Sequence, residues 1–379
     1  MNAAPSLPRW RRITIWVLII LAGLIGFVTA LTIWAKRQAL ETDQWVATSS
    51  RLLEDDQIRG ALSVYLVDQL YSNVDVAAEL QKSLPPQVKP LAAPIAGGLR
   101  ELSVRAADNL LARPGVQTLW REANRKAHET FLKIVDDKGE FVQTGGGDVV
   151  LDLRPLVDQL GDRVGLERLQ QRLGPDAGRI VIMKSDQLDT VQTAVDLIRK
   201  LSVWIAVAIL VLFALAVYLA QGRRRETLRA VGITFVVVGA LLLVVRRLVG
   251  NYLVDSLVNG ESVKRPVSDA WLIGTDLLKG IALTAIIYGA IVILAAVLAG
   301  PTRPAVSIRQ RLAPTLRERP GLLYTIVGGV YLLVVLWGPT PAFREPLWIL
   351  IFAALIGLGT EAFRRLTVRE FPASPAPAS

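Results

Sequence analysis

Six long apolar runs constrain the fold more than any other feature of this sequence. A helix needs about 20 apolar residues to cross a hydrocarbon core of about 30 Å. The first, second and fourth runs meet this requirement, and the other three reach it only if flanking polar side chains extend to the headgroups. The runs cover residues 13–35, 201–220, 230–245, 280–299, 322–337 and 346–360. With a mean hydropathy of +0.42, the chain is predicted to be a membrane protein with a bundle of about six transmembrane helices.

Basic residues are concentrated in short segments beside these runs. The chain has 43 Lys and Arg against 33 Asp and Glu, a net charge of +10. With six spans, four arginine-rich segments fall on the same side of the membrane, which the positive-inside rule makes cytoplasmic. They contain Arg9, Arg11 and Arg12, then Arg223, Arg224, Arg225 and Arg229, then Arg303, Arg309, Arg311, Arg317 and Arg319, and finally Arg364, Arg365 and Arg369.

This distribution indicates a topology signal and not a nucleic-acid-binding surface, because the charge is split among short segments next to the spans. Both termini are predicted to be cytoplasmic, and the arginine clusters are expected to attract anionic lipids of the bilayer. Residues 36–200 and the loops at 251–275 and 338–345 are expected outside. The predicted location is the bacterial plasma membrane, as a multi-pass protein.

The chain is therefore expected to have four parts. They are a cytoplasmic start and signal-anchor helix (1–35), an extracytoplasmic domain (36–200), a five-helix transmembrane bundle (201–363) and a cytoplasmic Pro/Ala-rich tail (364–379). The first run is longer than the apolar centre of a cleaved signal peptide, which has about 7 to 15 residues. Trp34-Ala35-Lys36 also offers no small-x-small cleavage site, so this run is predicted to be an uncleaved signal anchor.

The extracytoplasmic part is predicted to be a mostly helical α+β domain. Helical spacing of apolar residues predicts two helices over 42–71, separated by a break with an acidic cap at Asp55-Asp56. The same spacing predicts further helices over 76–84, 99–111, 114–134 and 155–173, and one from Ser185 into the second apolar run. A two-residue period of side chains predicts a hairpin of strands 140–144 and 149–153 around Gly145-Gly146-Gly147. A third strand is predicted over 179–183.

The composition excludes several kinds of chemistry. One histidine (His128), no cysteine and two methionines exclude thiolate zinc sites, iron–sulfur clusters, disulfides and Cys–His catalysis. We predict no catalytic residue, no cofactor and no metal site. Two weaker alternatives remain. The three glycines could hold a phosphate group through their backbone N–H groups, although a hairpin turn is the favoured interpretation. A second set of residues could bind Ca²⁺ or act as catalytic carboxylates, although surface ion pairs are favoured: Asp152, Asp158, Asp162, Asp186 and Asp189.

Trp120, Asn124 and His128 are the weak candidates for an external site. Their four-residue spacing places them near one face of a helix, and imidazole titrates near neutral pH. The competing interpretation is a polar member of a packed helix.

Charges at the outer ends of the third and fourth runs form the other candidate group. A charge inside a span costs roughly 2.5–3.5 kcal/mol on insertion scales and commonly marks pairing or function. Arg246 and Arg247 have three interpretations: snorkelling to headgroups, an ion pair with Asp276, or a transport pathway. Lys279 lies beside Asp276. Small residues at Ala285 and Gly289, and at Gly328-Gly329, are expected to permit close helix packing.

Three segments resemble those of uncharacterised actinobacterial integral membrane proteins. They are residues 42–45 (TDQW), 119–128 (LWREANRKAH) and 150–153 (VLDL). The resemblance implies an anchor, an external domain and a C-terminal bundle in the same order. That family brings no established activity, so it implies no catalytic residue.

The expected function is that of a non-enzymatic envelope protein whose extracytoplasmic domain binds a partner or ligand, in a scaffold or sensor-like role. The partner is an envelope protein or a second copy, and not a nucleic acid. A transporter or permease subunit is the alternative, because the layout resembles half of a resistance-nodulation-division exporter and, loosely, an FtsX-like permease. Proton-driven export requires carboxylates near the bilayer midplane, and the middles of the six runs contain none. An extracytoplasmic hydrolase is a third alternative.

Overall fold

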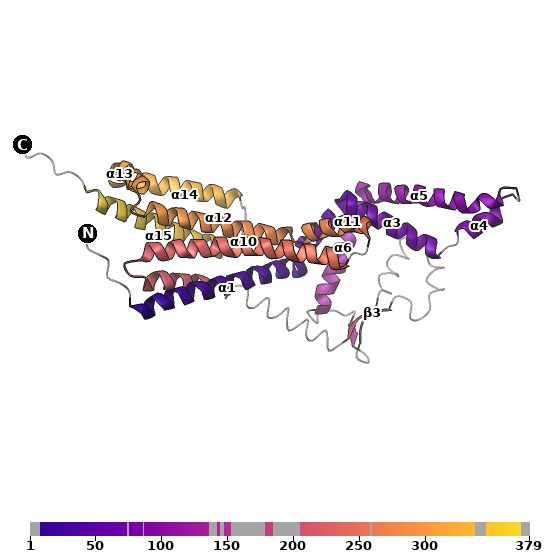
Figure 1. Cartoon of the computed structure of the whole chain (residues 1–379), viewed down its shortest axis with the longest axis horizontal. Coiled ribbons are helices and arrows are strands. Elements are labelled where there is room, and N and C mark those ends of the chain that lie inside the picture. Colours follow the sequence, from indigo (N-terminus) through magenta and orange to yellow (C-terminus); the bar gives the residue numbers. More distant parts are fainter. Residues whose placement is uncertain are drawn as a thin grey trace, which may run out of the picture. The chain divides into compact units, whose positions relative to one another are not determined.

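The computed structural model of the chain describes residues 8–73, 76–85, 87–135, 142–144, 148–152, 179–184, 205–257, 260–337 and 346–372 (Figure 1). Four of its helices are long and apolar enough to cross a membrane. They are α1 (Arg9–Leu40), α10 (Arg224–Leu257), α12 (Asp276–Leu298) and α15 (Pro346–Glu370). The described part of the chain is therefore that of a multi-pass membrane protein.

The predicted count of six spans is not confirmed. Helices α13 (Arg303–Glu318) and α14 (Pro320–Trp337) meet at a bend of 108°, and counting this pair as one span gives five candidates among the described residues. The helix Ile205–Leu219 is apolar but shorter. At 1.5 Å per residue its described length is about 22 Å, less than the hydrocarbon thickness, and residues 201–204 lie outside the described part.

The spans extend beyond the apolar runs that predicted them. Helix α10 begins at Arg224 and ends at Leu257, whereas its apolar run covers 230–245. Helix α15 likewise continues past Thr360 to Glu370. Arg, Glu and Leu are good helix formers, so the helical backbone continues where the apolar pattern stops.

The chain forms two compact units. The first unit contains Met1–Phe27, Val207–Leu242 and Gly280–Ser379, and the second contains Val28–Ala206 and Leu243–Lys279. In the core of the first unit, α1 packs against the helix Ile205–Leu219 and the start of α10. The buried residues of this core are Ile15, Ile19, Ala22, Phe213, Ala216, Ala220 and Val231.

Glycines bring α10 and α12 into backbone contact in the first unit. A Cβ atom added at Gly239 would lie 2.5 Å from the carbonyl oxygen of Ala282, and one at Gly289 would lie 2.6 Å from that of Gly232. Close approach at Gly289 was expected from the sequence. Gly328 and Gly329 differ from that expectation, because an added Cβ would meet nothing within 4 Å.

The second unit is built mainly from six α-helices of the described residues. They are α2 (Thr42–Glu54), α3 (Asp56–Asn73), α4 (Val76–Ser83), α5 (Ala92–Leu111), α6 (Pro114–Val135) and α11 (Glu261–Gly274), with the short 3₁₀ helix η1 (Lys89–Leu91) before α5. The break between α2 and α3 falls at the predicted position. Asp55 Oδ1 accepts hydrogen bonds from the backbone N–H groups of Gln57 (3.0 Å) and Ile58 (3.1 Å), which caps α3.

Helix α5 begins earlier than the sequence predicted. The expected start was Leu99, after Pro94 and the pair Gly97-Gly98, but the helix begins at Ala92. Pro94 lies in the first turn, where the missing N–H costs nothing, and packing against α3 and α4 maintains the helix through the glycines.

Ion pairs join α3 to α5. Arg100 pairs with Asp68, and Arg59 Nε lies 3.0 Å from Asp108 Oδ1. A hydrogen bond to Asp56 and the negative charge of Asp108 raise the pKa of the Arg59 guanidinium. The Arg59 guanidinium is therefore charged at any physiological pH.

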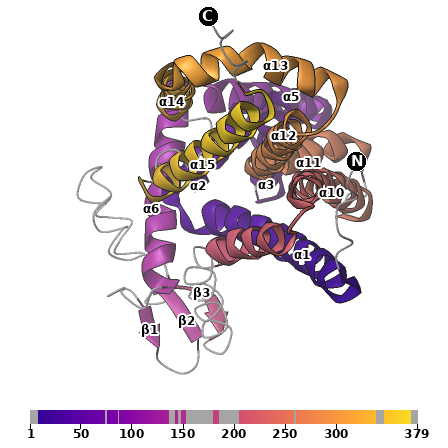
Figure 2. The same ribbon diagram turned by 90° about the vertical axis from the view of Figure 1, so that its left-hand side faces the viewer.

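Three strands lie in the segments where the two-residue period of the sequence predicted them. They are β1 (Val142–Thr144), β2 (Asp148–Asp152) and β3 (Arg179–Lys184), paired antiparallel in the order β1-β2-β3 (Figure 2). The strands contact one another extensively and helices α2 to α6 at most weakly. Within the described residues, the expected α+β domain is therefore not found as one packed body. The helices expected at 155–173 and from Ser185 lie outside the described residues.

Candidate functional site

His128 is buried where α6 meets the end of α1 and the start of α2. Its Nε2 lies 3.2 Å from the carbonyl oxygen of Ala39, and its Nδ1 lies 3.1 Å from Thr42 Oγ1. A neutral ring with its proton on Nε2 donates to Ala39 and accepts from the Thr42 hydroxyl. The ring is stacked on Trp45, with centroids 5.1 Å apart.

The bond to Ala39 gives His128 a structural role that the spacing within α6 does not reveal. Ala39 lies in the last turn of α1, where the carbonyl groups have no partner within the helix. His128 satisfies one of them and so caps a helix that is separate from its own. Because both ring nitrogens are engaged, the imidazole has no free position for acid–base work in this arrangement.

Trp120 and Asn124 lie on the same helix and are also engaged in structural bonds. Trp120 Nε1 donates to the carbonyl oxygen of Ser49 at 3.0 Å, which joins α6 to α2. Asn124 Nδ2 donates to the carbonyl oxygen of Trp120 at 2.9 Å. The three weak candidates thus belong to a face of α6 that carries packing contacts and helix-end hydrogen bonds.

No group of three His, Cys, Asp or Glu residues that could hold a metal ion occurs in the described part of the chain. Of the carboxylates considered from the sequence, Asp158, Asp162, Asp186 and Asp189 lie outside that part, as do the three glycines at 145–147. Asp152 ends β2.

Arg246 joins α10 to the end of α11. Its Nε donates to Thr275 Oγ1 at 2.8 Å and to the Thr275 carbonyl at 3.2 Å, and its Nη2 donates to the Leu272 carbonyl at 3.1 Å. Trp271 Nε1 donates in return to the carbonyl of Arg246 at 3.0 Å. A positive charge at the carbonyl end of a helix is favourable, so Arg246 caps α11.

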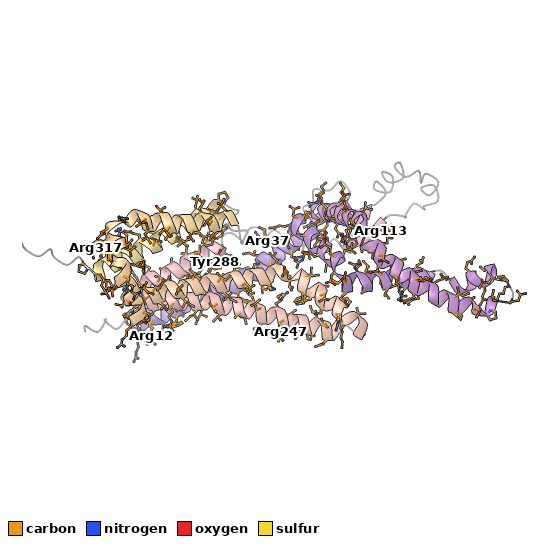
Figure 3. The ribbon with its side chains drawn as sticks, turned by 90° about the horizontal axis from the view of Figure 1, so that it is seen from above. Arg12, Arg37, Arg113, Arg247, Tyr288 and Arg317 are labelled. Atoms are coloured by element: carbon orange, nitrogen blue, oxygen red, sulfur yellow. The ribbon has the colours of Figure 1, made fainter. Side chains whose placement is uncertain are left out.

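Asp276 does not pair with Arg246 or Arg247, which corrects the ion pair considered from the sequence. Its partner is Arg51 on α2, with Nη1 3.0 Å from Oδ2. Both side chains are about half exposed, so the pair is worth at most about 1 kcal/mol. Arg247, labelled in Figure 3, is exposed. Lys279 is also exposed.

Residues 243–279 form part of the second unit, which the sequence analysis did not detect. Helix α11 packs against α2 and α3, and Trp34 Nε1 lies 3.4 Å from the Gly274 carbonyl oxygen. The four-residue spacing of Val263, Val267 and Trp271 was the available signal for a helix here.

The second unit has an exposed apolar face along α5. It consists of Ile95, Leu99 and Leu102 of α5 together with Leu91, the residue directly before the helix. The four recur every three or four residues and so share one side. Leu102 is 61% exposed and Leu91 52%. Helix α5 is not among the candidate membrane spans of the described residues. We refer to these four residues as the α5 apolar face.

Comparison with known proteins gives no identification. No protein-family model matches the chain, and no curated protein or solved structure is significantly similar to it. The resemblance of three sequence segments to actinobacterial membrane proteins therefore stays an expectation.

Proposed function

We propose that this chain is a non-enzymatic integral protein of the bacterial plasma membrane whose extracytoplasmic unit binds an envelope protein, as a scaffold or sensor-like component. In this proposal the chain crosses the bilayer six times, both termini are cytoplasmic, and residues 36–200 are extracytoplasmic. The shorter helix Ile205–Leu219 and the bent pair α13–α14 then each contribute one span.

The arrangement of arginines in the first unit supports this topology. Arg12, near the start of α1, and Arg317, near the end of α13, lie at the same end of the unit (Figure 3). The carbonyl oxygen of Phe371, just after α15, accepts a hydrogen bond from Arg317. Three arginine-rich segments that are far apart in the sequence therefore meet at one end, which the positive-inside rule assigns to the cytoplasm.

The α5 apolar face is the observation that carries the binding role. Protein surfaces in contact with water rarely expose several large aliphatic side chains in one stripe unless a partner covers them. Burying a fully exposed side chain of this kind gains about 1.5–3 kcal/mol, and the four residues here, 38–61% exposed, forgo a part of that gain. A stripe of four such residues is suited to pack against an apolar face of a partner protein.

An enzymatic role is less well supported, because the ring nitrogens of His128 are occupied by Ala39 and Thr42. Transport is the alternative. The apolar runs of α1, α10, α12 and α15 (residues 13–35, 230–245, 280–299 and 346–360) contain no carboxylate that could carry protons across the bilayer, and Glu361 of α15 follows its run.

Site-specific photo-crosslinking in living cells tests the proposal. A photoreactive residue at Leu102 is expected to give one discrete crosslinked envelope protein, and Leu99→Glu is expected to abolish it. The matched control is the same photoreactive residue at Ala93, which is exposed on the same helix but, nine residues before Leu102, lies on the opposite side of it. A crosslinked second copy of this chain would identify the partner as the protein itself.

Equal crosslinking from both positions, or none from Leu102, would refute the binding role. Stoichiometric recovery of a cytoplasmic ATPase with the purified protein would favour transport.

A further inference from the structure

Helix α13 lies across the direction of α14. The two helices meet at 108°, so if α14 crosses the bilayer, α13 lies close to the membrane plane. Figure 2 shows α14 nearly end-on while α13 extends along the picture. Both helices belong to the first unit, so their relative orientation is defined within one compact body.

Arg309 fixes this orientation. Its side chain is only 1% exposed, and its Nε and Nη2 donate to the two carboxylate oxygens of Glu370, each at 2.9 Å. Its Nη1 donates to the carbonyl oxygens of Gly300, at 2.8 Å, and of Leu298. Arg309 therefore attaches the buried side of α13 to the ends of α12 and α15.

The outer surface of α13 is divided into two stripes. The buried side consists of Ala305, Arg309, Ala313 and Leu316. Beside it, Ile308 (43% exposed) and Leu312 (41%) form an apolar stripe at four-residue spacing. Arg303, Ser307 and Arg311 follow the same spacing and are exposed on the side opposite the buried residues. An apolar stripe next to a basic one is the pattern of a helix that lies in a membrane–water interface.

We propose that α13 lies in the membrane–water interface and binds the phosphate groups of anionic lipids through Arg303 and Arg311. Ile308 and Leu312 enter the boundary between headgroups and acyl chains. The guanidinium groups meet phosphates that carry the complementary charge, which favours a lipid surface over a neutral protein surface. This inference does not depend on the α5 apolar face or on which side of the membrane α13 occupies.

Single-cysteine variants test the position of α13, because the chain has no cysteine of its own. Nitroxide labels on Ile308→Cys and Ser307→Cys are compared in nanodiscs that contain phosphatidylglycerol and phosphatidylcholine. The label at 308 is expected to collide with oxygen dissolved in the lipid, and the label at 307 with a water-soluble nickel complex. Equal access of the nickel complex to both labels would show that α13 lies clear of the membrane and would favour a protein partner instead.

Titration with short-chain phosphatidylglycerol in phosphatidylcholine nanodiscs tests the lipid contact. A basic residue near an anionic surface strengthens binding by about fivefold, so Arg303→Gln/Arg311→Gln is expected to raise the apparent Kd by about tenfold or more. Arg303→Lys/Arg311→Lys is expected to retain most of the affinity. The matched control is Arg105→Gln/Arg113→Gln, in the second unit, with no change expected. An unchanged Kd in the first variant, with the helix content and thermal midpoint of the wild type, would overturn the proposal.

Discussion

Replacing Gly239 by alanine is expected to destabilise the first unit by about 2 kcal/mol, because overpacking a close contact costs roughly 1–3 kcal/mol. The new Cβ atom would lie 2.5 Å from the backbone oxygen of Ala282 and 2.7 Å from Ile286 Cγ1. The Ala282 oxygen belongs to the helix backbone and cannot withdraw unless α10 and α12 move apart. Gly232→Ala and Gly289→Ala are expected to act in the same direction. Thermal unfolding in a mild detergent measures the effect.

Gly328→Ala is the matched control for this substitution. It introduces the same methyl group in a helix where nothing lies within 4 Å. Since alanine favours a helix over glycine by about 0.5–1 kcal/mol, this variant is expected to unfold at the same temperature as the wild type or slightly above it. Equal destabilisation by Gly239→Ala and Gly328→Ala would mean that α10 and α12 are not in backbone contact.

Arg309→Met is the second substitution with a large expected effect. It removes four hydrogen bonds and leaves Glu370 without its partner. Breaking a buried ion pair typically costs 3–5 kcal/mol, and we expect about 2–3 kcal/mol here because solvent screens the partly exposed carboxylate. The thermal midpoint in detergent is expected to fall by several degrees.

The double variant Arg309→Met/Glu370→Gln separates the unpaired charge from the lost hydrogen bonds. It is expected to recover part of the stability, because the remaining glutamine carries no charge. Arg105→Gln removes one partner of an exposed pair and is expected to leave the midpoint unchanged. No recovery in the double variant would show that the charge of Glu370 is not the source of the loss.

The helices that local rules define were predictable from the sequence. Asp55 marks the start of α3, and Pro114 the start of α6. The alternating segments at 142–144 and 148–152 form the expected hairpin strands. In each case the signal lies within a few residues of the element that it specifies.

Features that depend on tertiary contacts could not be predicted. Helix α5 passes through Gly97 and Gly98 because α3 and α4 pack against it, and this packing overrides the intrinsic preference of glycine. Helix α10 also continues beyond Val245, where the apolar run ends, to Leu257, but here the reason is local, because flanking residues such as Arg and Leu favour a helix. Periodicity gives the middle of such helices but not their ends.

In the candidate sites, too, local features were predictable from the sequence and tertiary contacts were not. Spacing within α6 correctly placed Trp120, Asn124 and His128 on one helix. It could not identify the partner of His128, because Ala39 lies 89 residues away and offers only a backbone carbonyl. Arg246 also binds backbone carbonyls. Because every residue has a carbonyl group, the residue types do not reveal such a partner, and the sequence suggested the carboxylate of Asp276 instead.

The position of α5 and α13 on opposite sides of the membrane is the central claim, and labelling of single cysteines tests it most directly. A membrane-impermeant maleimide is added to intact cells that express Leu102→Cys or Gln310→Cys, and again after permeabilisation. Both side chains are exposed in the structure, so burial does not limit the reaction. We expect Leu102→Cys to react in intact cells and Gln310→Cys only after permeabilisation. Reaction of both variants in intact cells, or the reverse pattern, would contradict the account.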